Sequence, residues 1–257
     1  SPDATLDHLL THSSGIADDA DEEAGEDYAD LWINKANYSV TQAADFLPQF
    51  AYKPANFSPG QGARYCNCAF VLAGLMVEKA SGLSYRDYVH RHIFTPAGMT
   101  RSGFFRMDEV TEDLAEGCDP ILDDQERIIG WKKNIYSYPP IGTPDGGAHV
   151  TAGDLAQFLS AAQQGRLLSA EFTRQFFTPQ VFNRSGKSFD RYYGFGLEFL
   201  LEKETHKIIA YQKDGQNAGA SGIIRHLVEP GITIVLLSNL EEGVWEPVWK
   251  IHESILG

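Results

Sequence analysis

The amino-acid sequence predicts an α+β fold in which helices and loops come first, an antiparallel sheet follows, and a helix closes the chain. Three observations lead to this prediction: capped helical patterns dominate before residue 190, strand-like runs follow it, and alternating strand–helix–strand units are absent. The missing alternation argues against a Rossmann or TIM-barrel fold. We expect one interwoven domain, mainly helices and loops over residues 1–190, with antiparallel strands and the C-terminal helix over residues 191–257.

The helices are predicted from apolar periodicity and from capping residues. Ser84 and Ser169 are good N-cap residues, Thr151 opens a capping-box-like stretch, and Gly82 supplies a helix stop. A short apolar segment also runs over residues 5–11. The predicted helices cover residues 39–50, 67–80, 84–94, 155–164, 169–177 and 245–256.

The strands are predicted from runs rich in β-branched and aromatic residues. Glu229-Pro230-Gly231 is a tight turn between the last two runs, which therefore form an antiparallel hairpin. The predicted strands cover residues 192–200, 207–212, 223–228 and 232–238.

Composition excludes several classes of protein. The chain of 257 residues is 43% hydrophobic and 12% aromatic, which is enough to form a packed core and argues against disorder. Its 21 Lys and Arg against 35 Asp and Glu give a formal charge of −14, which argues against a nucleic-acid partner. No apolar run approaches the ~20 residues that a membrane-spanning helix needs.

Two local patterns raise the question of metal binding. Eight acidic residues lie between Asp18 and Asp30, without the ligand spacing of an EF-hand loop, and we expect a solvated loop. His8 and His12 have the spacing of paired zinc ligands on a helix but lack the adjacent Glu of such motifs, so we interpret them as structural.

The cysteines do not form a disulfide framework. Cys66 and Cys68 are too close for an ordinary disulfide, and Cys118 is alone. We expect small buried thiols, and their number does not fix the cellular compartment.

The candidate chemistry begins at Tyr65-Cys66-Asn67, just after a turn at Phe57-Ser58-Pro59-Gly60. A Tyr and an Asn two residues apart at a helix start can face one cleft, where Tyr moves a proton and Asn binds an amide. The Gly-x-Ser-x-Gly elbow of α/β-hydrolases is absent, although Gly219-Ala220-Ser221-Gly222 comes close to it.

An ordered set of motifs spans nearly the whole chain. The set comprises LDHLLTHSSGI at 6–16, FSPG at 57–60, YCN at 65–67, GLMVEKASG at 74–82, PAGM at 96–99, GGAHVTAGDL at 146–155, YGFG at 193–196 and IVLLSN at 234–239. In this order the segments resemble the β-lactamase-related serine hydrolases: class C β-lactamases, D-alanyl-D-alanine carboxypeptidases and esterases of the same fold. The resemblance implies a β-lactamase/transpeptidase-like antiparallel sheet flanked by helices, with a helical subdomain.

The resemblance also implies roles for individual residues. Tyr65 falls on the family's general base or proton relay, and Asn67 on a hydrogen-bonding partner of the substrate or of the active-site Lys. Lys213-Asp214-Gly215 is the best match to the family's third motif, in which Lys213 supplies positive charge and Gly215 leaves room for the substrate. The backbone N–H of Gln216 would then be one oxyanion-hole donor.

This third motif leaves alternatives open. Asp214 replaces the usual small hydroxyl residue, which puts penicillin-type substrates in doubt. A second register over residues 216–222 lacks the cation, and Lys213 could also be an ordinary surface lysine.

The family's nucleophile lies in a Ser-x-x-Lys motif, and no Ser of this chain has Lys three positions later. In the family that motif precedes the HLLTH stretch, where this chain nearly begins. We expect a serine hydrolase whose nucleophile-bearing N-terminal part is missing, so that this chain alone is inactive. It would act on a small ester, β-lactam or D-amino amide, without metal or cofactor.

The alternative is a non-catalytic binding domain that has lost its nucleophile. Without the missing segment, apolar surface would be exposed, so we also expect self-association or binding of that segment.

Overall fold

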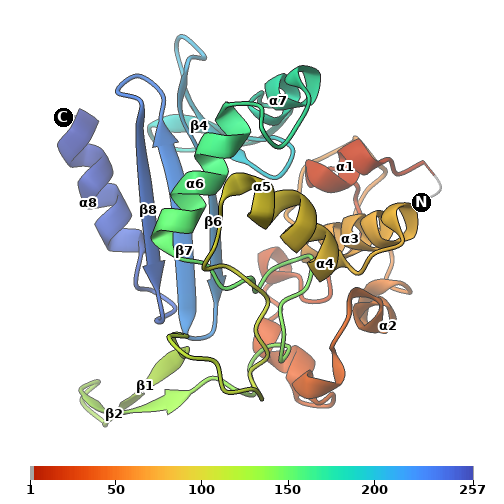
Figure 1. Ribbon diagram of the computed structural model, residues 1–257, viewed down its shortest axis with the longest axis vertical. Coiled ribbons are helices and arrows are strands. Elements are labelled where there is room, and N and C mark those ends of the chain that lie inside the picture. The colour runs from red at the N-terminus through yellow and green to blue at the C-terminus, as the bar shows by residue number, and fades with distance from the viewer. Residues whose placement is uncertain (1–2, 257) are drawn as a thin grey trace.

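A six-stranded antiparallel sheet forms one half of the protein, in a computed structural model that describes residues 3–256 (Figure 1). Its strands pair in chain order, so each hydrogen-bonds to the next along the sequence. The strands are β3 (Val181–Ser185), β4 (Phe189–Tyr193), β5 (Glu198–Glu202), β6 (Ile208–Asn217), β7 (Ala220–Leu227) and β8 (Ile232–Ser238).

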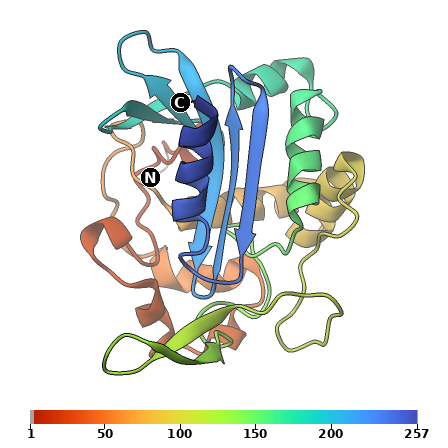
Figure 2. The same cartoon turned by 90° about the vertical axis from the view of Figure 1, so that its left-hand side faces the viewer.

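Helices cover both faces of this sheet. The C-terminal helix α8 (Trp245–Leu256) lies along one face, and α6 (Ala152–Gln163) lies on the other (Figures 1 and 2). Because side chains alternate along a strand, neighbouring residues enter different cores. Ile223 packs in the core under α8, whereas Ile224 packs with α6 and α7 (Ala170–Phe176).

The helical half is built around α3 (Asn67–Ser81) and has its own core. Val71 is fully buried there among side chains that include Leu9 and Phe46. Around α3 lie α1 (Leu6–Leu10), α2 (Leu47–Phe50), α4 (Tyr85–Val89) and α5 (Thr95–Ala97), four 3₁₀ turns (Glu22–Ala24, Tyr28–Trp32, Asn37–Ser39, Ala43–Phe46) and a π-helical turn (His90–Phe94). An α3 that is apolar on nearly all sides fits this buried position.

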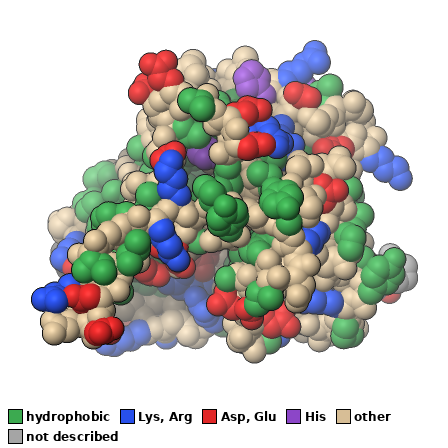
Figure 3. Space-filling model, turned by 90° about the horizontal axis from the view of Figure 1, so that it is seen from below, with side chains coloured by type: hydrophobic (Ala, Val, Ile, Leu, Met, Phe, Trp, Pro, Cys, Tyr) green, Lys and Arg blue, Asp and Glu red, His purple; other side chains and the backbone are tan. Residues whose placement is uncertain are grey.

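A separate two-stranded hairpin projects at one end, formed by β1 (Cys118–Leu122) and β2 (Ile128–Lys133). Pairing puts Pro120 opposite Trp131 and Leu122 opposite Ile128, on one face of the hairpin. Three of these side chains are about half exposed, and Figure 3, which looks from this end, shows hydrophobic and charged side chains mixed on the surface. Over residues 3–256, no helix is both long and apolar enough to cross a membrane.

The predicted α+β fold is confirmed, as are helices 67–80, 84–94, 155–164, 169–177 and 245–256 within a few residues. The predicted final hairpin is also confirmed, with β7 and β8 joined at Glu229-Pro230-Gly231. The predicted division at residue 190 falls inside β4 and stays a prediction.

Two local predictions were wrong, and one element was missed. Residues 39–50 do not form one helix: Ala43–Phe46 is a 3₁₀ turn, and only Leu47–Phe50 is α-helical. Asp45 accepts hydrogen bonds from the backbone N–H groups of Thr41 and Gln42 in a capping box, which starts the helical turn at Ala43 rather than at residue 39. The predicted strand 192–200 is divided by a turn in which Gly196 has φ +85°. The β1–β2 hairpin was not predicted.

Candidate active site

Tyr65 and Lys213 meet where the helical half faces the sheet. The Lys213 Nζ lies 3.5 Å from the Tyr65 hydroxyl oxygen and 5.0 Å from the centre of the Tyr65 ring. The two residues are 148 positions apart in the sequence, so only the folded chain brings them together. Tyr65 is 37% exposed and Lys213 is half-buried, so solvent or a ligand can reach both groups.

Strand β6 places Lys213 at an open edge of the sheet. Its pairing with β5 ends at Glu198 opposite Gln212, while its pairing with β7 continues to Asn217. From Lys213 to Asn217, no strand among residues 3–256 pairs with β6 on the β5 side. Lys213 lies two residues after Tyr211 on β6, so both side chains face the same side of the sheet, where Tyr211 packs in the core with α6. Its side chain therefore projects toward the helical half, beside backbone groups that could pair with an extended ligand.

Tyr65 and Asn67 are placed by the start of α3. Cys66 is the N-cap residue, and its side chain makes no capping hydrogen bond. The acceptors come instead from residues about fifty positions earlier. Asp18 accepts from the backbone N–H of Asn67 at 2.8 Å and of Cys68 at 2.9 Å, and His12 Nδ1 accepts from the N–H of Cys66 at 3.1 Å.

His12 is buried beside this pair and is neutral. Its ring lies 4.4 Å from that of Tyr65 and 4.8 Å from that of Tyr193, between ring centres. Burial first, and then the positive charge of Lys213, lower the pKa of His12 to about 3. Because Nδ1 accepts the Cys66 N–H, the single ring proton is assigned to Nε2.

Buried carboxyl groups lie at the base of α3, which corrects the prediction of a wholly solvated acidic loop. Asp18 and Asp19 are 4% and 3% exposed, because the first of them caps α3 from inside the protein. Burial and the neighbouring charge of Asp18 raise the pKa of Asp19 to about 7. Desolvation raises the pKa of Asp145 to about 6, with Asp18 adding to the effect. Much of the acidic stretch from Glu22 to Asp30 is exposed, as predicted.

This cluster is a poor metal site, although ligand atoms of Asp18, Asp19 and Cys68 lie within 4.8 Å of one another. Both Asp18 oxygens already accept hydrogen bonds from α3. Burial, followed by the two nearby carboxylates, raises the pKa of the Cys68 thiol far above its usual range, whereas a metal needs the thiolate. The expectation of no metal stays a prediction.

The other predicted site residues differ in where their side chains lie. Asn67 is half-buried at the first turn of α3, two residues from Tyr65. A Cβ at Gly215 would meet no atom within 4 Å, so the space beside it is open, and its use by a substrate stays a prediction. The side chain of Gln216 instead donates to Glu241 and Glu242 in the loop after β8, which leaves only its backbone N–H for the predicted role.

The two possible registers of the third motif have different geometries. Lys213-Asp214-Gly215 lies within β6, with Asp214 on the opposite face from Lys213 by strand alternation. The second register, residues 216–222, spans the turn from β6 to β7, and the hydroxyl of Ser221 within it already donates a hydrogen bond to the carbonyl of Leu240 at 2.7 Å. The geometry favours the first register.

The sequence reasoning missed His12 and Asp18. His8 and His12 do not act as a pair, because His8 caps α1 while His12 lies past its end with φ +55°. One signal could have pointed to both residues: Cys66 is a poor N-cap, so the buried start of α3 needs hydrogen-bond acceptors from elsewhere. The predicted buried thiols of Cys66 and Cys68 are confirmed.

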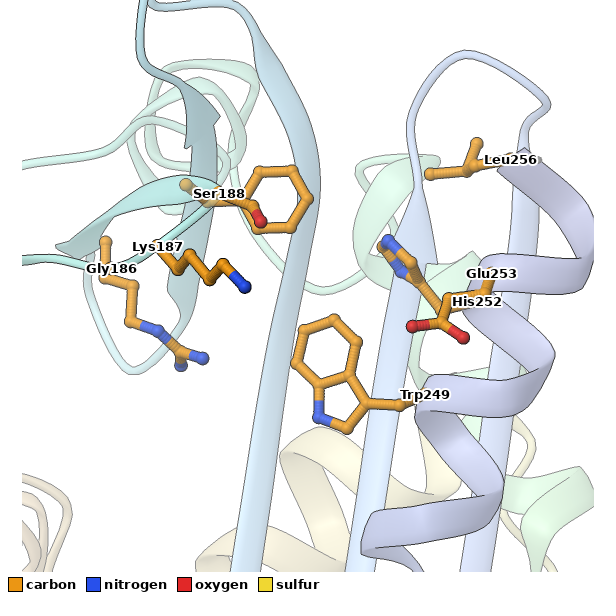
Figure 4. A pocket seen from close by; sticks show the side chains of 9 residues that line it. Gly186, Lys187, Ser188, Trp249, His252, Glu253 and Leu256 are labelled. Carbon is orange, nitrogen blue, oxygen red and sulfur yellow. The ribbon is translucent and has the colours of Figure 1, made fainter.

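Two pockets lie outside this pair of residues. One, of about 450 Å³, separates the β3–β4 hairpin from α8, with Lys187 and Ser188 on one side and Trp249 and Glu253 on the other (Figure 4). Because α8 forms one wall, it opens on the sheet face opposite Lys213. The second, of about 430 Å³, is an apolar pocket between α1 and α3 that includes Phe70.

The fold and the meeting of Tyr65 with Lys213 agree with one known protein family. The family model described as Beta-lactamase matches residues 1–249. The chain therefore belongs to the Beta-lactamase family, and the resemblance stated from its motifs is confirmed.

Similar proteins come from several bacteria. Penicillin-binding protein 4* of Bacillus subtilis is 27% identical over 263 residues, which cover 98% of this chain and 55% of the relative. A D-aminopeptidase of Cereibacter sphaeroides is 26% identical over 83% of this chain and 39% of its own. The crystal structure of a penicillin-binding protein from Bacillus halodurans has a TM-score of 0.90 and 34% identity over 98% of this chain and 74% of its own. The chain thus spans about half the length of the curated relatives it matches, or less.

Proposed function

We propose that this chain forms most of the active site of a serine hydrolase that works through an acyl-enzyme, with the nucleophilic Ser supplied from outside residues 1–257. The observation that carries the proposal is the approach of Lys213 Nζ to the Tyr65 hydroxyl, 3.5 Å apart at the open edge of β6. Membership of the Beta-lactamase family supports this hydrolase class.

The proposed reaction has two steps. The Ser oxygen attacks the substrate carbonyl, its proton passes through Tyr65 to the leaving group, and the bond from the carbonyl carbon to the leaving group breaks. Water then attacks the acyl-enzyme, and its proton returns to the Ser oxygen as the ester bond breaks. Lys213 and the N–H of Gln216 stabilise the negative charge that develops on the carbonyl oxygen.

The proposed substrate is a small ester, β-lactam or D-amino amide. The third class is supported by the similarity to a D-aminopeptidase. Asp214, where the family has a small hydroxyl residue, argues against penicillin-type carboxylates, so we place β-lactams last. No metal or cofactor enters the proposed reaction.

The proposed function is tested first by sequencing the gene upstream of this chain and then by assaying the longer protein. The reading frame upstream of Ser1 is expected to encode Ser-x-x-Lys, and the longer protein is expected to hydrolyse a chromogenic ester or a D-amino acid anilide. In that protein, Tyr65→Phe should slow turnover about 10²- to 10⁴-fold, the usual range for a lost proton-transfer group. Tyr38→Phe is a matched control, because it removes the same hydroxyl group from a tyrosine that is 69% exposed.

The alternative is a binding domain without catalysis. One observation favours it: no Ser of the printed sequence is followed three positions later by Lys. An upstream frame without Ser-x-x-Lys, together with ligand binding but no turnover, would establish the alternative. Acylation of a serine within residues 1–257 during turnover would contradict the assignment of the nucleophile in the main proposal.

A further inference from the structure

We infer that His12 and Asp18 are positioning residues, which together hold the Tyr65-Cys66-Asn67 segment where Tyr65 meets Lys213. Neither residue is assigned a part in the reaction proposed above. The catalytic consequence of this inference rests on the proposed function, whereas its structural consequence does not.

The first argument is hydrogen-bond accounting at the start of α3. A helix leaves its first backbone N–H groups without partners, and buried N–H groups are costly when unpaired. Here three consecutive N–H groups, those of Cys66, Asn67 and Cys68, are all satisfied by His12 and Asp18. Tyr65 and Asn67 lie on either side of the first of these bonds, so the same contacts fix both candidate residues.

The second argument is charge. A carboxylate at a helix N-terminus is stabilised by the helix dipole and by charge-assisted hydrogen bonds. Asp18 is 4% exposed and offers one oxygen to each of two N–H groups. Its neighbour Asp19 makes a different contact, because Asp19 Oδ1 accepts from the N–H of Ala20.

The third argument is that His12 is hydrogen-bonded to the chain on both sides of Tyr65. The carbonyl of His12 accepts from the N–H of Arg64 at 2.8 Å, while its ring accepts from the N–H of Cys66. His12 makes both contacts from a left-handed backbone conformation, with φ +55°, which is uncommon for a residue other than Gly. The ring also packs against Tyr65, so a shift of residue 12 is passed directly to the Tyr65 side chain.

The structural test uses the 257-residue chain. Nuclear Overhauser contacts between the Tyr65 ring and the Lys213 side chain are expected in the wild type, weaker in Asp18→Asn and absent in Asp18→Ala. Asp154→Ala is the matched control: Asp154 is 7% exposed and accepts from the N–H of Arg101 and the hydroxyl of Ser102. This control should destabilise the chain but keep the contact. Retention of the contact in Asp18→Ala would overturn the inference.

His12→Asn provides a second, milder variant. Asn tolerates the left-handed backbone but lacks the ring and Nδ1 that reach Cys66 and Tyr65. We expect the Tyr65–Lys213 contact to weaken while the chain stays folded. An unchanged contact would contradict the role of His12.

The catalytic test uses the protein that includes the sequence preceding Ser1. If catalysis depends on this placement, Asp18→Asn lowers kcat about 10- to 100-fold with little change in KM, since small displacements of a reacting group have effects of this size. Asp154→Asn should leave both constants unchanged. If both variants lost stability while kcat stayed unchanged, Asp18 would only cap helix α3 and would not position Tyr65 for catalysis. Absence of hydrolysis in the wild type would instead count against the proposed function, while the contact measurement would still decide the inference.

Discussion

Two buried polar clusters lie on opposite sides of the sheet, and they differ in how their charges are balanced. Under α8, Arg225 is 1% exposed, donates to Gln212 and stacks on Trp249, and Gln212 in turn donates to Glu198. At the start of α3, by contrast, Asp18, Asp19 and Asp145 gather carboxyl groups of one sign. The first cluster alternates donors with acceptors, whereas the second concentrates like charges.

From this difference we infer that the cluster under α8 stabilises the fold, whereas the cluster at the start of α3 lies beside the candidate active site. In the cluster under α8, Glu198 also pairs with Arg191, so carboxylate and guanidinium groups compensate one another within the sheet. The like charges at α3 are tolerated because the helix start needs acceptors and because Asp19 takes up a proton readily. Strand β6 joins the two regions, since Gln212 belongs to the first and Lys213 projects toward the second.

The largest effect on the free energy of unfolding is expected from breaking the cluster under α8. Arg225→Ala leaves the buried side-chain oxygen of Gln212 without its donor and removes the stacking on Trp249, whereas Glu198 keeps Gln212 and Arg191. Leaving a buried acceptor unpaired costs about 1–3 kcal/mol, and the lost packing on Trp249 adds to this cost, which urea denaturation of the 257-residue chain would measure. Arg184→Ala, at an exposed position of β3, is the control and should change stability by less than about 0.5 kcal/mol. Similar losses in the two variants would show that Arg225 contributes little.

The contrast between the clusters also marks what the sequence could predict. The order of motifs led to Tyr65 and Lys213, because each motif is local and survives as a short pattern. The acceptors at α3 could not be predicted in the same way, since their partners are about fifty residues away and only folding brings them together. For the same reason Asp18 and Asp19 were placed in a solvated loop: a run of acidic residues normally prefers water, and tertiary hydrogen bonds reversed that preference.

The second-largest effect on stability is expected from the cluster of like charges at the start of α3, and it depends on pH. Asp19 has a pKa of about 7 in the folded chain, raised by burial from its ordinary value of 3.8. The folded chain therefore holds a proton that the unfolded chain releases, and this stabilisation is lost as pH rises through about 7. Relative to Asp19→Asn, the wild type should lose up to about 1.4 kcal/mol of unfolding free energy per pH unit between pH 4 and 7.

Only the difference between variants isolates Asp19. Burial lowers the pKa of His12 to about 3, so this residue opposes the trend: its contribution falls as pH drops below 6.5. Chemical denaturation at several pH values should be paired with Asp113→Asn, an exposed control on a loop. If the gap between the wild type and Asp19→Asn were constant from pH 5 to 8, like-charge burial would not be the explanation.

The smallest effect on stability is expected beyond both clusters, where β6 continues past Lys213 with one edge open. Gly215→Ala adds a methyl group that meets no atom within 4 Å, so the unfolding free energy should change by less than about 0.5 kcal/mol. In the longer, active protein the same methyl group occupies space that the substrate is proposed to use, so KM should rise. Gly130→Ala in the β1–β2 hairpin is the comparison, because a Cβ there has only ordinary contact with Ile121 at 3.5 Å, so neither stability nor KM should change. A Gly215→Ala variant that binds and turns over substrate like the wild type would show that the ligand does not approach this edge, and that Lys213 acts from its side chain alone.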